Sequence, residues 1–221
     1  MGKNKQRRFS EKAVQRFFTA DQHFGHTNIL KYQPNRRHQN VEVMDSAIVD
    51  AWNSVVTHAD TVYCVGDMSY NLASLRECLR FLNGRKVLVV GNHDPFFKDM
   101  VNGDRQRIDA ARAKALEIGF AEIHQELLLE IPEIGMVKLS HFPYLPTVTE
   151  ELPDYALRYP HLRPVRGNEK LLLHGHVHSD WLAKDDAGAM LNVGIDVWKM
   201  RPVSESEIVE KFQRLGDLNH G

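Results

Sequence analysis

The sequence predicts an α/β protein, because short apolar runs alternate with amphipathic segments through its first half. Apolar runs that end in glycine or polar residues are typical of buried strands in a covered sheet. Strands that alternate with helices are typical of a parallel α/β sheet. The chain has 221 residues, of which 43% are hydrophobic, and this fits one globular domain, which we place at residues 16–221.

Five apolar runs, each followed by glycine or polar residues, are expected to be strands. They are residues 17–20, 62–65, 87–90, 137–140 and 171–174. Three amphipathic segments are expected to be helices, and they are residues 42–57, 73–83 and 104–118. The apolar face of the first of these helices is expected to hold Val43, Ile48, Trp52 and Val55. The second and third helices are followed by Gly84 and Gly119, and glycine is a favourable C-terminal cap.

The second half of the chain is richer in strands than the first. Its expected strands are residues 123–131, 136–140, 170–174 and 189–195. Gly135 is expected to turn the first two of them into a hairpin. Residues 143–169 contain five prolines and read as an irregular segment. Since a loop of this length in a compact domain is usually functional, we expect it to be a cap over the strand ends.

Composition excludes several classes of protein. The formal net charge is −1, so no overall field attracts the chain to nucleic acid or to a membrane surface. Two cysteines, Cys64 and Cys78, make neither a disulfide framework nor a cysteine-based zinc cluster. The apolar runs are too short to span a membrane, and no signal-peptide core follows the N-terminus. We therefore expect a cytoplasmic protein with no membrane association and no obligate protein partner.

The N-terminal residues 1–15 are predicted to be a flexible basic arm. Residues 1–16 carry six basic side chains and one acidic side chain, which is a local net charge of +5. A solvated leader is the favoured interpretation of this run, and contact with a phosphate backbone is the alternative.

Polar side chains with metal-binding chemistry follow the five predicted strands. In chain order they are Asp21, His23, Asp67, Asn92, His93, Asp94, His141, His176 and His178. In open α/β sheets, ligands bind beyond the carboxyl ends of the strands, so we expect these side chains to converge. Imidazole, carboxylate and amide donors without thiolate suit Mn, Fe, Zn or Ni better than Ca or Mg. There are too many donors for one tetrahedral ion and enough for two, and Asp67 stands alone on its strand end, where it is free to bridge them.

The order of these residues resembles the motif set of the calcineurin-like metallophosphoesterases. The motifs are Asp21-x-His23, Gly66-Asp67, Gly91-Asn92-His93-Asp94, His141 and Gly175-His176-x-His178, and residues 192–196 resemble a common closing strand. Each motif alone is weak, but the ordered set is specific. The resemblance implies a four-layer α/β/β/α sandwich, with two packed sheets flanked by helices.

The resemblance also implies the role of each ligand. One metal would be held by Asp21, His23, Asp67 and His178. The second would be held by Asp67, Asn92, His141 and His176, with Asp67 bridging the two ions. The implied cofactor is a pair of divalent metal ions, of which Mn is favoured and Fe, Zn and Ni are alternatives.

The chemistry expected of such a site is hydrolysis of phosphate esters. Two bridged ions lower the pKa of a shared water, and the resulting hydroxide attacks phosphorus in line. We expect His93 to protonate the leaving oxygen and Asp94 to accept a hydrogen bond from the far nitrogen of its ring. Capping of the segment that begins at Pro95 is an alternative role for Asp94.

The substrate class is left open by the motifs. A phosphodiester is favoured, with a nucleotide or a nucleic acid as candidates. The alternatives are phosphomonoesterase activity, nucleotide pyrophosphatase activity, and a non-catalytic scaffold that binds protein.

Other polar residues near these motifs have two interpretations each. Residues 36–38 form a basic run, for which a solvated charge run is favoured over a phosphate-binding site. His174 is expected in the core or behind the metal ligands rather than as a ligand itself. His26 and Asn28 are expected either to face the phosphate or to cap their loop.

Overall fold

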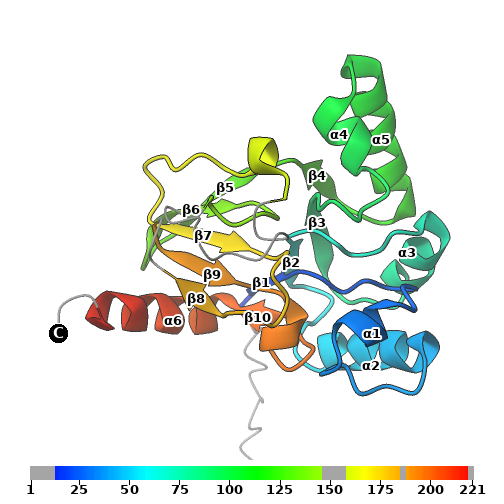
Figure 1. Cartoon of the computed structure of the whole chain (residues 1–221), viewed down its shortest axis with the longest axis horizontal. Helices are drawn as coiled ribbons and strands as arrows, with labels where there is room; N and C mark the ends of the chain where they lie inside the picture. The colour runs from blue at the N-terminus through cyan, green and yellow to red at the C-terminus, as the bar shows by residue number, and fades with distance from the viewer. Residues whose placement is uncertain (1–12, 146–157, 185–187, 219–221) are drawn as a thin grey trace, which may run out of the picture.

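The computed structural model describes residues 13–145, 158–184 and 188–218. Most of the predicted basic arm and residues 146–157 of the predicted cap lie outside the described residues. Figure 1 shows two five-stranded sheets with helices on their flanks, and this confirms the predicted fold class. Among the described helices, none combines the length and apolar character needed to cross a membrane.

The first sheet is mainly parallel, in the order β10-β1-β2-β3-β4. Its strands are β1 (Arg16–Thr19), β2 (Thr61–Cys64), β3 (Arg85–Val89), β4 (Glu122–His124) and β10 (Val203–Ser204). Strands β1 to β4 are parallel to their neighbours, and β10 is antiparallel to β1. The carboxyl ends of β1, β2 and β3 therefore lie at one edge of this sheet.

The second sheet is mixed, in the order β5-β6-β7-β9-β8. Its strands are β5 (Leu127–Ile131), β6 (Gly135–Leu139), β7 (Leu171–His174), β8 (Ala183–Lys184) and β9 (Met190–Asn192). The hairpin predicted at Gly135 is confirmed, because β5 and β6 pair antiparallel with Ile131 opposite Gly135. The strands β6, β7 and β9 are parallel, so the residues that follow β6 and β7 also lie at one edge.

The prediction of one strand over residues 123–131 is wrong. The segment contains β4 in the first sheet and β5 in the second, with Gln125 and Glu126 between them. Ile123 packs with the helices of the first sheet, whereas Ile131 packs between the two sheets. The apolar pattern alone does not reveal this crossing, because both halves read as buried strand.

The helices confirm the three predicted segments in part. The helices are α1 (Ile29–Tyr32), α2 (Val41–Asn53), α3 (Leu72–Leu79), α4 (Phe97–Asn102), α5 (Arg105–Ile118) and α6 (Glu205–Leu218), with short 3₁₀ turns at Pro160–Leu162 and Ile195–Val197. Gly119 caps α5 as predicted, with a φ of 118°. The cap predicted at Gly84 is wrong, because α3 ends at Leu79 and Gly84 forms the turn that leads into β3. On α2, Val43 is exposed and Met44 takes its expected place in the core.

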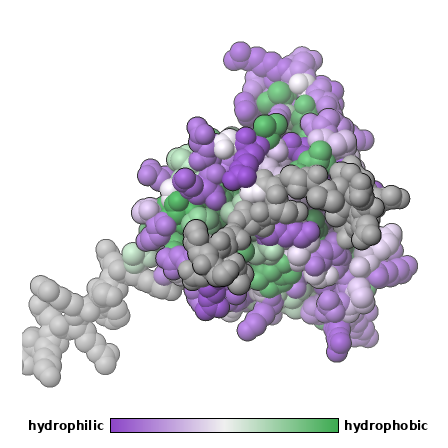
Figure 2. Space-filling view, turned by 60° about the vertical axis from the view of Figure 1, so that its left-hand side comes forward, coloured by the Kyte–Doolittle hydropathy of each residue, from purple (hydrophilic) through white to green (hydrophobic). Residues whose placement is uncertain are grey.

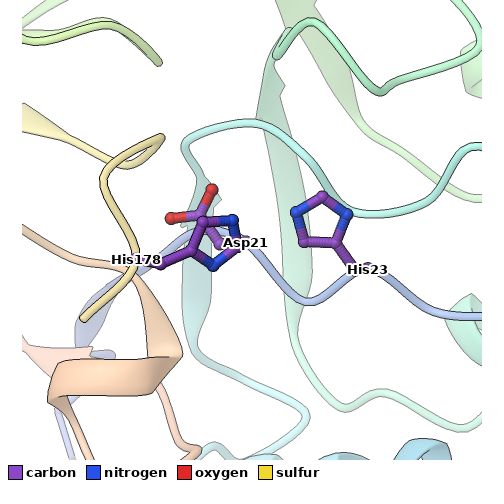
Figure 3. Close-up of side chains that lie close together, drawn as sticks. All are labelled: Asp21, His23 and His178. Carbon is purple, nitrogen blue, oxygen red and sulfur yellow. The ribbon is translucent and has the colours of Figure 1, made fainter. Parts of the chain in front are cut away.

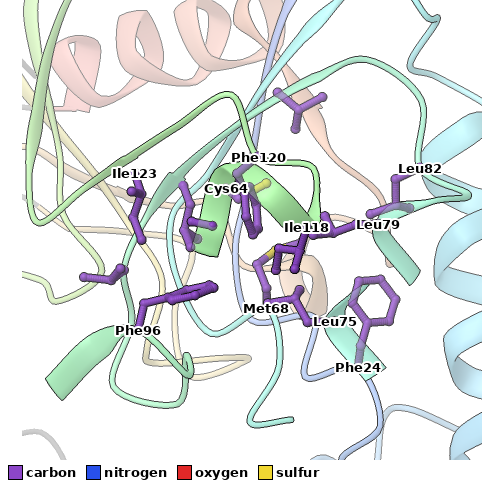
Figure 4. Close-up of a cluster of buried hydrophobic side chains, with 14 of the residues drawn as sticks. Phe24, Cys64, Met68, Leu75, Leu79, Leu82, Phe96, Ile118, Phe120 and Ile123 are labelled. Atoms are coloured by element: carbon purple, nitrogen blue, oxygen red, sulfur yellow. The ribbon is translucent and has the colours of Figure 1, made fainter. Parts of the chain in front are cut away.

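Two hydrophobic clusters hold these layers together. The first lies between the first sheet and its helices, and Figure 4 shows part of it, including Phe24, Met68 and Leu75. The second lies between the sheets and is closed by Ile208 of α6. Figure 2 shows that hydrophobic residues on the displayed face gather only in small patches, as expected when most apolar area is buried in two cores.

The two sheets meet where their polar strand ends lie. Ala20, directly after β1, forms a parallel bridge with Gly194, which follows β9. The next residue, Asp21, donates its backbone N–H to Gly66 O at 3.0 Å, directly after β2. The polar residues after β1, β2, β3, β6 and β7 are thereby brought to one place.

Leu173 and Leu128 offer a matched test of the inter-sheet core. Leu173 is fully buried between the sheets, whereas Leu128 on the same sheet is 54% exposed. We expect Leu173→Ala to lower the free energy of unfolding by about 3 kcal/mol, through lost burial and a residual cavity. Leu128→Ala should change it by less than about 0.5 kcal/mol. Urea unfolding followed by circular dichroism measures both, and equal losses would contradict the assignment of this core.

Candidate metal centre

The predicted ligands converge from strand ends that are far apart in the chain. Asp21, His23 and His178 each offer one ligand atom, and these atoms lie within 4.8 Å of one another. Figure 3 shows these three side chains, two from the loop after β1 and one from the turn after β7. Asp21, Asp67 and His141 form a second such group. The two groups share the carboxylate of Asp21.

Asp67 lies at the centre of the imidazoles. Its Oδ2 is 3.3 Å from His141 Nε2, 3.6 Å from His23 Nε2 and 4.0 Å from His93 Nε2. Its Oδ1 accepts a hydrogen bond from the backbone N–H of His93 at 2.8 Å. One carboxylate oxygen therefore faces histidines from β1, β3 and β6, the placement expected of a bridging ligand.

His176 and Asn92 complete the predicted set. The ring of His176 lies 5.3 Å from that of His141, centroid to centroid. The backbone N–H of His176 donates to the carboxylate of Asp21, at 3.1 Å to each oxygen. Asn92 lines the same cavity as Asp67 and His176, and its side-chain oxygen is buried.

Several buried polar atoms of these residues have no hydrogen-bond partner among the described residues. They are Nδ1 and Nε2 of His23, Oδ1 of Asn92, Nδ1 of His93, Nε2 of His141 and Nε2 of His176. Burying a polar atom without a partner is costly, and most buried polar atoms in proteins are satisfied. The three Nε2 atoms and the amide oxygen belong to residues of the predicted ligand set. The donor set therefore fits a divalent metal, which would satisfy these atoms.

The backbone at the site is held in a sparsely populated conformation. Left-handed φ values of 49° to 73° occur at five predicted ligands, which are Asp21, His23, Asp67, His176 and His178. The described residues contain only three other non-glycine positions with positive φ. A left-handed conformation costs a non-glycine residue of order 1–3 kcal/mol, and such residues cluster at functional sites. In this protein, the left-handed conformation brings the side chains of these five residues close together.

Two glycines of the motifs are required by the close approach of the strand ends. A Cβ at Gly66 would lie 2.4 Å from Nδ1 of His141, and one at Gly91 would lie 2.3 Å from Oδ1 of Asp67. Each distance is far below van der Waals contact. The glycines before Asp67 and Asn92 therefore allow the ends of β2 and β3 and the ring of His141 to pack closely together.

Comparison with known proteins identifies relatives over nearly the whole chain. Gene 66 protein of Mycobacterium phage L5 is 32% identical over 205 residues, covering 88% of this chain and 92% of the relative. The chain belongs to the Gene 66 family. An uncharacterized protein of Methanocaldococcus jannaschii is 46% identical over 205 residues, covering 90% of this chain and 91% of that protein. No family model matches the sequence.

Among solved structures, a protein of unknown function from Aquifex aeolicus has the fold of this Gene 66 family member. It is 27% identical, with a TM-score of 0.61, and the match covers 89% of this chain and 98% of that one. Phosphopantetheinyl hydrolase from Mycobacterium tuberculosis matches with a TM-score of 0.46 and 14% identity, covering 86% of this chain and 95% of that one. The second match is too distant to bear on activity.

Electrostatics hold Asp67, His23 and His176 of this Gene 66 family member in forms that bind metal. Burial acts to raise the pKa of Asp67, but the imidazoles of His141, His23 and His93 hold it well below its usual value. Burial lowers the pKa of His23 and of His176, the latter to about 2. Burial also acts to lower the pKa of His141, but Asp67 raises it to about 9. Asp67 is thus a carboxylate, and a metal would displace a proton from His141 on binding.

Asp94 has a different role from the one expected. Its oxygens accept hydrogen bonds from the backbone N–H groups of Gly91 (2.7 Å), Asp67 (3.0 Å) and Met68 (2.8 Å). The carboxylate therefore ties the end of β3 to the end of β2. The prediction that it orients the His93 ring is wrong, since Nδ1 of His93 has no hydrogen-bond partner among the described residues.

Arg36 and Asp196 form a buried pair behind the site that the sequence interpretation missed. Arg36 was expected in a solvated run, yet it is only 2% exposed. Its Nε and one terminal nitrogen each lie 2.7 Å from an oxygen of Asp196. The same guanidinium donates to the backbone carbonyls of Asp21 and Gln22. Arg36 therefore fastens the loop that carries Asp21 and His23 to the segment that carries Asp196.

Asp196 in turn fixes His178. It accepts a hydrogen bond from His178 Nδ1 at 2.8 Å, which leaves Nε2 of that ring to ligate. A carboxylate behind a ligating histidine sets its tautomer and ring orientation. In the sequence, the position of Asp196 in the closing segment 192–196 was the one indication of this pair. The residues around Arg36 do not indicate that it pairs with Asp196.

His174 and His26 lie where one of their two interpretations placed them, whereas the side chain of Asn28 neither caps α1 nor lines the cavity that Asp67 lines. His174 is buried, with Nδ1 2.8 Å from Gly175 O and its ring 4.6 Å from that of Trp181, so it belongs to the core. His26 lines a cavity of about 660 Å³ together with Asp67, His93 and His176. The described end of the predicted cap contributes Arg158 and Tyr159 to that cavity.

Replacing Arg36 tests whether it organises the metal centre. We expect Arg36→Lys to weaken metal binding about 10-fold to 100-fold, because one ammonium cannot hold both oxygens of Asp196 and the two backbone carbonyls together. Titration of metal-free protein with Mn²⁺, followed calorimetrically, measures this affinity. Arg37→Lys is the matched control, because Arg37 is exposed beside it. Equal affinities for both variants would contradict the assigned role of Arg36.

Asp45 gives a pH-dependent test of the loop that carries His23. Its Oδ2 accepts from the backbone N–H of Gly25 at 2.9 Å, and burial raises its pKa from 3.8 to about 6. The folded-state pKa is raised, so the stability that proton binding provides is present below pH 4 and lost as pH rises through 6. We expect Asp45→Asn to raise the free energy of unfolding by about 1 kcal/mol at pH 7.5, allowing for solvent screening. Near pH 4 the difference should vanish.

Urea unfolding of both proteins at pH 4, 6 and 7.5 measures this difference. Asp50→Asn, an exposed position on the same helix, serves as the control and should stay within about 0.5 kcal/mol of the parent. A gain in Asp45→Asn that is the same at all three pH values would contradict the electrostatic explanation.

Proposed function

We propose that this protein is a metal-dependent hydrolase of phosphate esters that uses two divalent ions. The observation that carries the proposal is the convergence of buried, unpartnered ligand atoms on Asp67. The ordered motifs, which resemble those of calcineurin-like metallophosphoesterases, support the same chemistry. We further propose manganese as the favoured metal and the cytoplasm as the location.

The ligand assignment follows the order of the motifs, in which Asp67 would be the shared carboxylate. Asp21, His23, Asp67 and His178 would hold one ion, and Asp67, Asn92, His141 and His176 would hold the other, as the motif order implies. Divalent ions there would polarise the phosphoryl group, neutralise its developing charge and lower the pKa of the attacking water. The chain's own contribution is to hold these donors rigidly, through the left-handed backbone and the Arg36–Asp196 pair.

His93 is our candidate for the general acid. Its side chain is 31% exposed and lines the cavity beside Asp67, so it reaches both the ligands and the substrate space. The ring of Tyr70 lies 4.2 Å from the His93 ring and restricts its orientation. We propose that His93 gives its proton to the leaving oxygen, and that Asp94 supports this step only by fixing the backbone on either side of it.

The favoured substrate is a phosphodiester. The proposed mechanism needs no serine or cysteine nucleophile, so no covalent intermediate is expected. Phosphomonoesters and nucleotide pyrophosphates are the alternative substrates for the same site, and a non-catalytic scaffold is the alternative without turnover.

Turnover by the metal-loaded protein tests the proposal. We expect full-length protein reconstituted with Mn²⁺ to hydrolyse a bis-aryl phosphate faster than the matching aryl monophosphate, and chelation to abolish both rates. Elemental analysis should find two ions per chain, and fewer in Asp67→Asn. Metal-loaded protein that hydrolyses no diester, monoester or nucleotide would overturn the function.

The leaving group tests the role of His93 separately. We expect His93→Ala to lower kcat/KM about 100-fold to 10,000-fold with a dialkyl phosphate, which can release only an alkoxide, because loss of a general acid matters most for a poor leaving group. The loss of kcat/KM should be much smaller with a methyl nitrophenyl phosphate, from which nitrophenolate departs. His58→Ala, at an exposed histidine, is the control. An equal loss with both leaving groups would remove His93 as the acid.

A further inference from the structure

The cavity that holds the candidate centre is lined by three of the six tyrosines of the chain. Tyr32, Tyr70 and Tyr159 contribute to it, and they are 67%, 52% and 37% exposed. The mechanism proposed above uses none of their rings as acid, base or ligand. Large aromatic side chains gathered in the open around one cavity are typical of a ligand-binding wall rather than of a folding core.

Tyr32 and Tyr70 are joined to the catalytic groups by a run of ring contacts. Tyr70 lies 4.2 Å from His93 and 5.2 Å from His26, centroid to centroid. His26 lies 5.4 Å from the ligand His23 and 6.3 Å from Tyr32. The wall therefore begins at the candidate metal ligands and acid, and ends at Tyr32, which contacts His23 through the ring of His26.

The rest of the cavity supplies polar groups. Arg158 lines it as an exposed cation, and Gln33 lines it next to Tyr32. Gln33 accepts a hydrogen bond from Ser179 through Oε1 at 3.0 Å, which leaves the amide N–H groups of Gln33 for a ligand. Exposed aromatic rings, an amide and an arginine beside a candidate phosphoryl site match the parts of a nucleotide, which are a base and its phosphates.

We propose that Tyr32 and Tyr70 form a stacking platform for a nucleobase, and that the substrate is a phosphodiester of a nucleoside. This proposal rests on the proposed function, because it names the substrate class of the same site. Stacking on an aromatic side chain suits every base, since each has a π-face. The platform therefore gives preference for nucleosides over other alcohols without strong preference among bases.

A dinucleotide and its abasic analogues test the platform. The substrates are thymidylyl-thymidine and the two analogues in which one base is replaced by hydrogen. With metal-loaded full-length protein, we expect removal of the stacked base to lower kcat/KM about 10-fold to 100-fold, mainly through KM. Removal of the other base should matter less, which would also show on which side of the phosphate the platform lies.

Substitution at Tyr32 links this preference to the structure. Tyr32→Ala should abolish the preference for the base-bearing substrate, whereas Tyr32→Phe should keep the preference. Phe81→Ala removes a ring that is 58% exposed and does not line the cavity, and it should have no effect. Equal kcat/KM values for all three substrates, or a preference that survives in Tyr32→Ala, would overturn the platform.

Direct binding separates failure of this inference from failure of the function. Metal-loaded protein is titrated with thymidine 5′-monophosphate and with deoxyribose 5-phosphate. Tighter binding of the nucleotide, lost in Tyr32→Ala and kept in Tyr32→Phe, supports the platform even where no ester is hydrolysed and the function has failed. Equal affinities for both ligands, together with equal rates of hydrolysis of the base-bearing and abasic esters, would overturn the platform. The proposed function would still stand, because the esters are hydrolysed.

Discussion

The approach of the two sheets at their polar ends is the constraint on which the site depends. Ala20 bridges to Gly194 across the sheets, and Asp21 is hydrogen-bonded to the end of β2 at Gly66. At this junction, ligands from the first sheet face His141 and His176 from the second. Neither sheet carries the complete set, so the site exists only because the inter-sheet core holds the two edges in register.

Most local contributions to the free energy of folding at the site are unfavourable. Five ligands have left-handed backbones, several buried polar atoms lack partners, and burial raises the pKa of Asp21. Strain of this kind persists only where the surroundings over-determine the structure. The two hydrophobic clusters and the buried Arg36–Asp196 pair provide that support. The outcome is a set of donors held in place before any ligand arrives, which is the preorganisation that electrostatic catalysis requires.

The convergence of the candidate ligands was easier to predict from the sequence than the contacts that support them, for a physical reason. The candidate ligands lie within a few residues of the strand ends, so short motifs such as Asp21-x-His23 reveal them in the sequence. The supports are long-range contacts. Arg36 and Asp196 are separated by 160 positions, and Arg36 looks like its exposed neighbour Arg37. The split of residues 123–131 between two sheets was hidden for the same reason, because burial on either side of a sheet gives the same local pattern.

The metal centre and the aromatic wall belong to one structural unit. Residues 21–36 begin with two candidate ligands, pass through His26 and Tyr32, and close on themselves when Arg36 donates to the carbonyls of Asp21 and Gln22. Any change that loosens this closure moves the ligands and the wall together. One buried guanidinium therefore holds together the segment that carries both the candidate ligands and Tyr32. Metal affinity and selection of the alcohol group of the substrate should therefore change together in variants of Arg36, although Arg36 does not line the cavity.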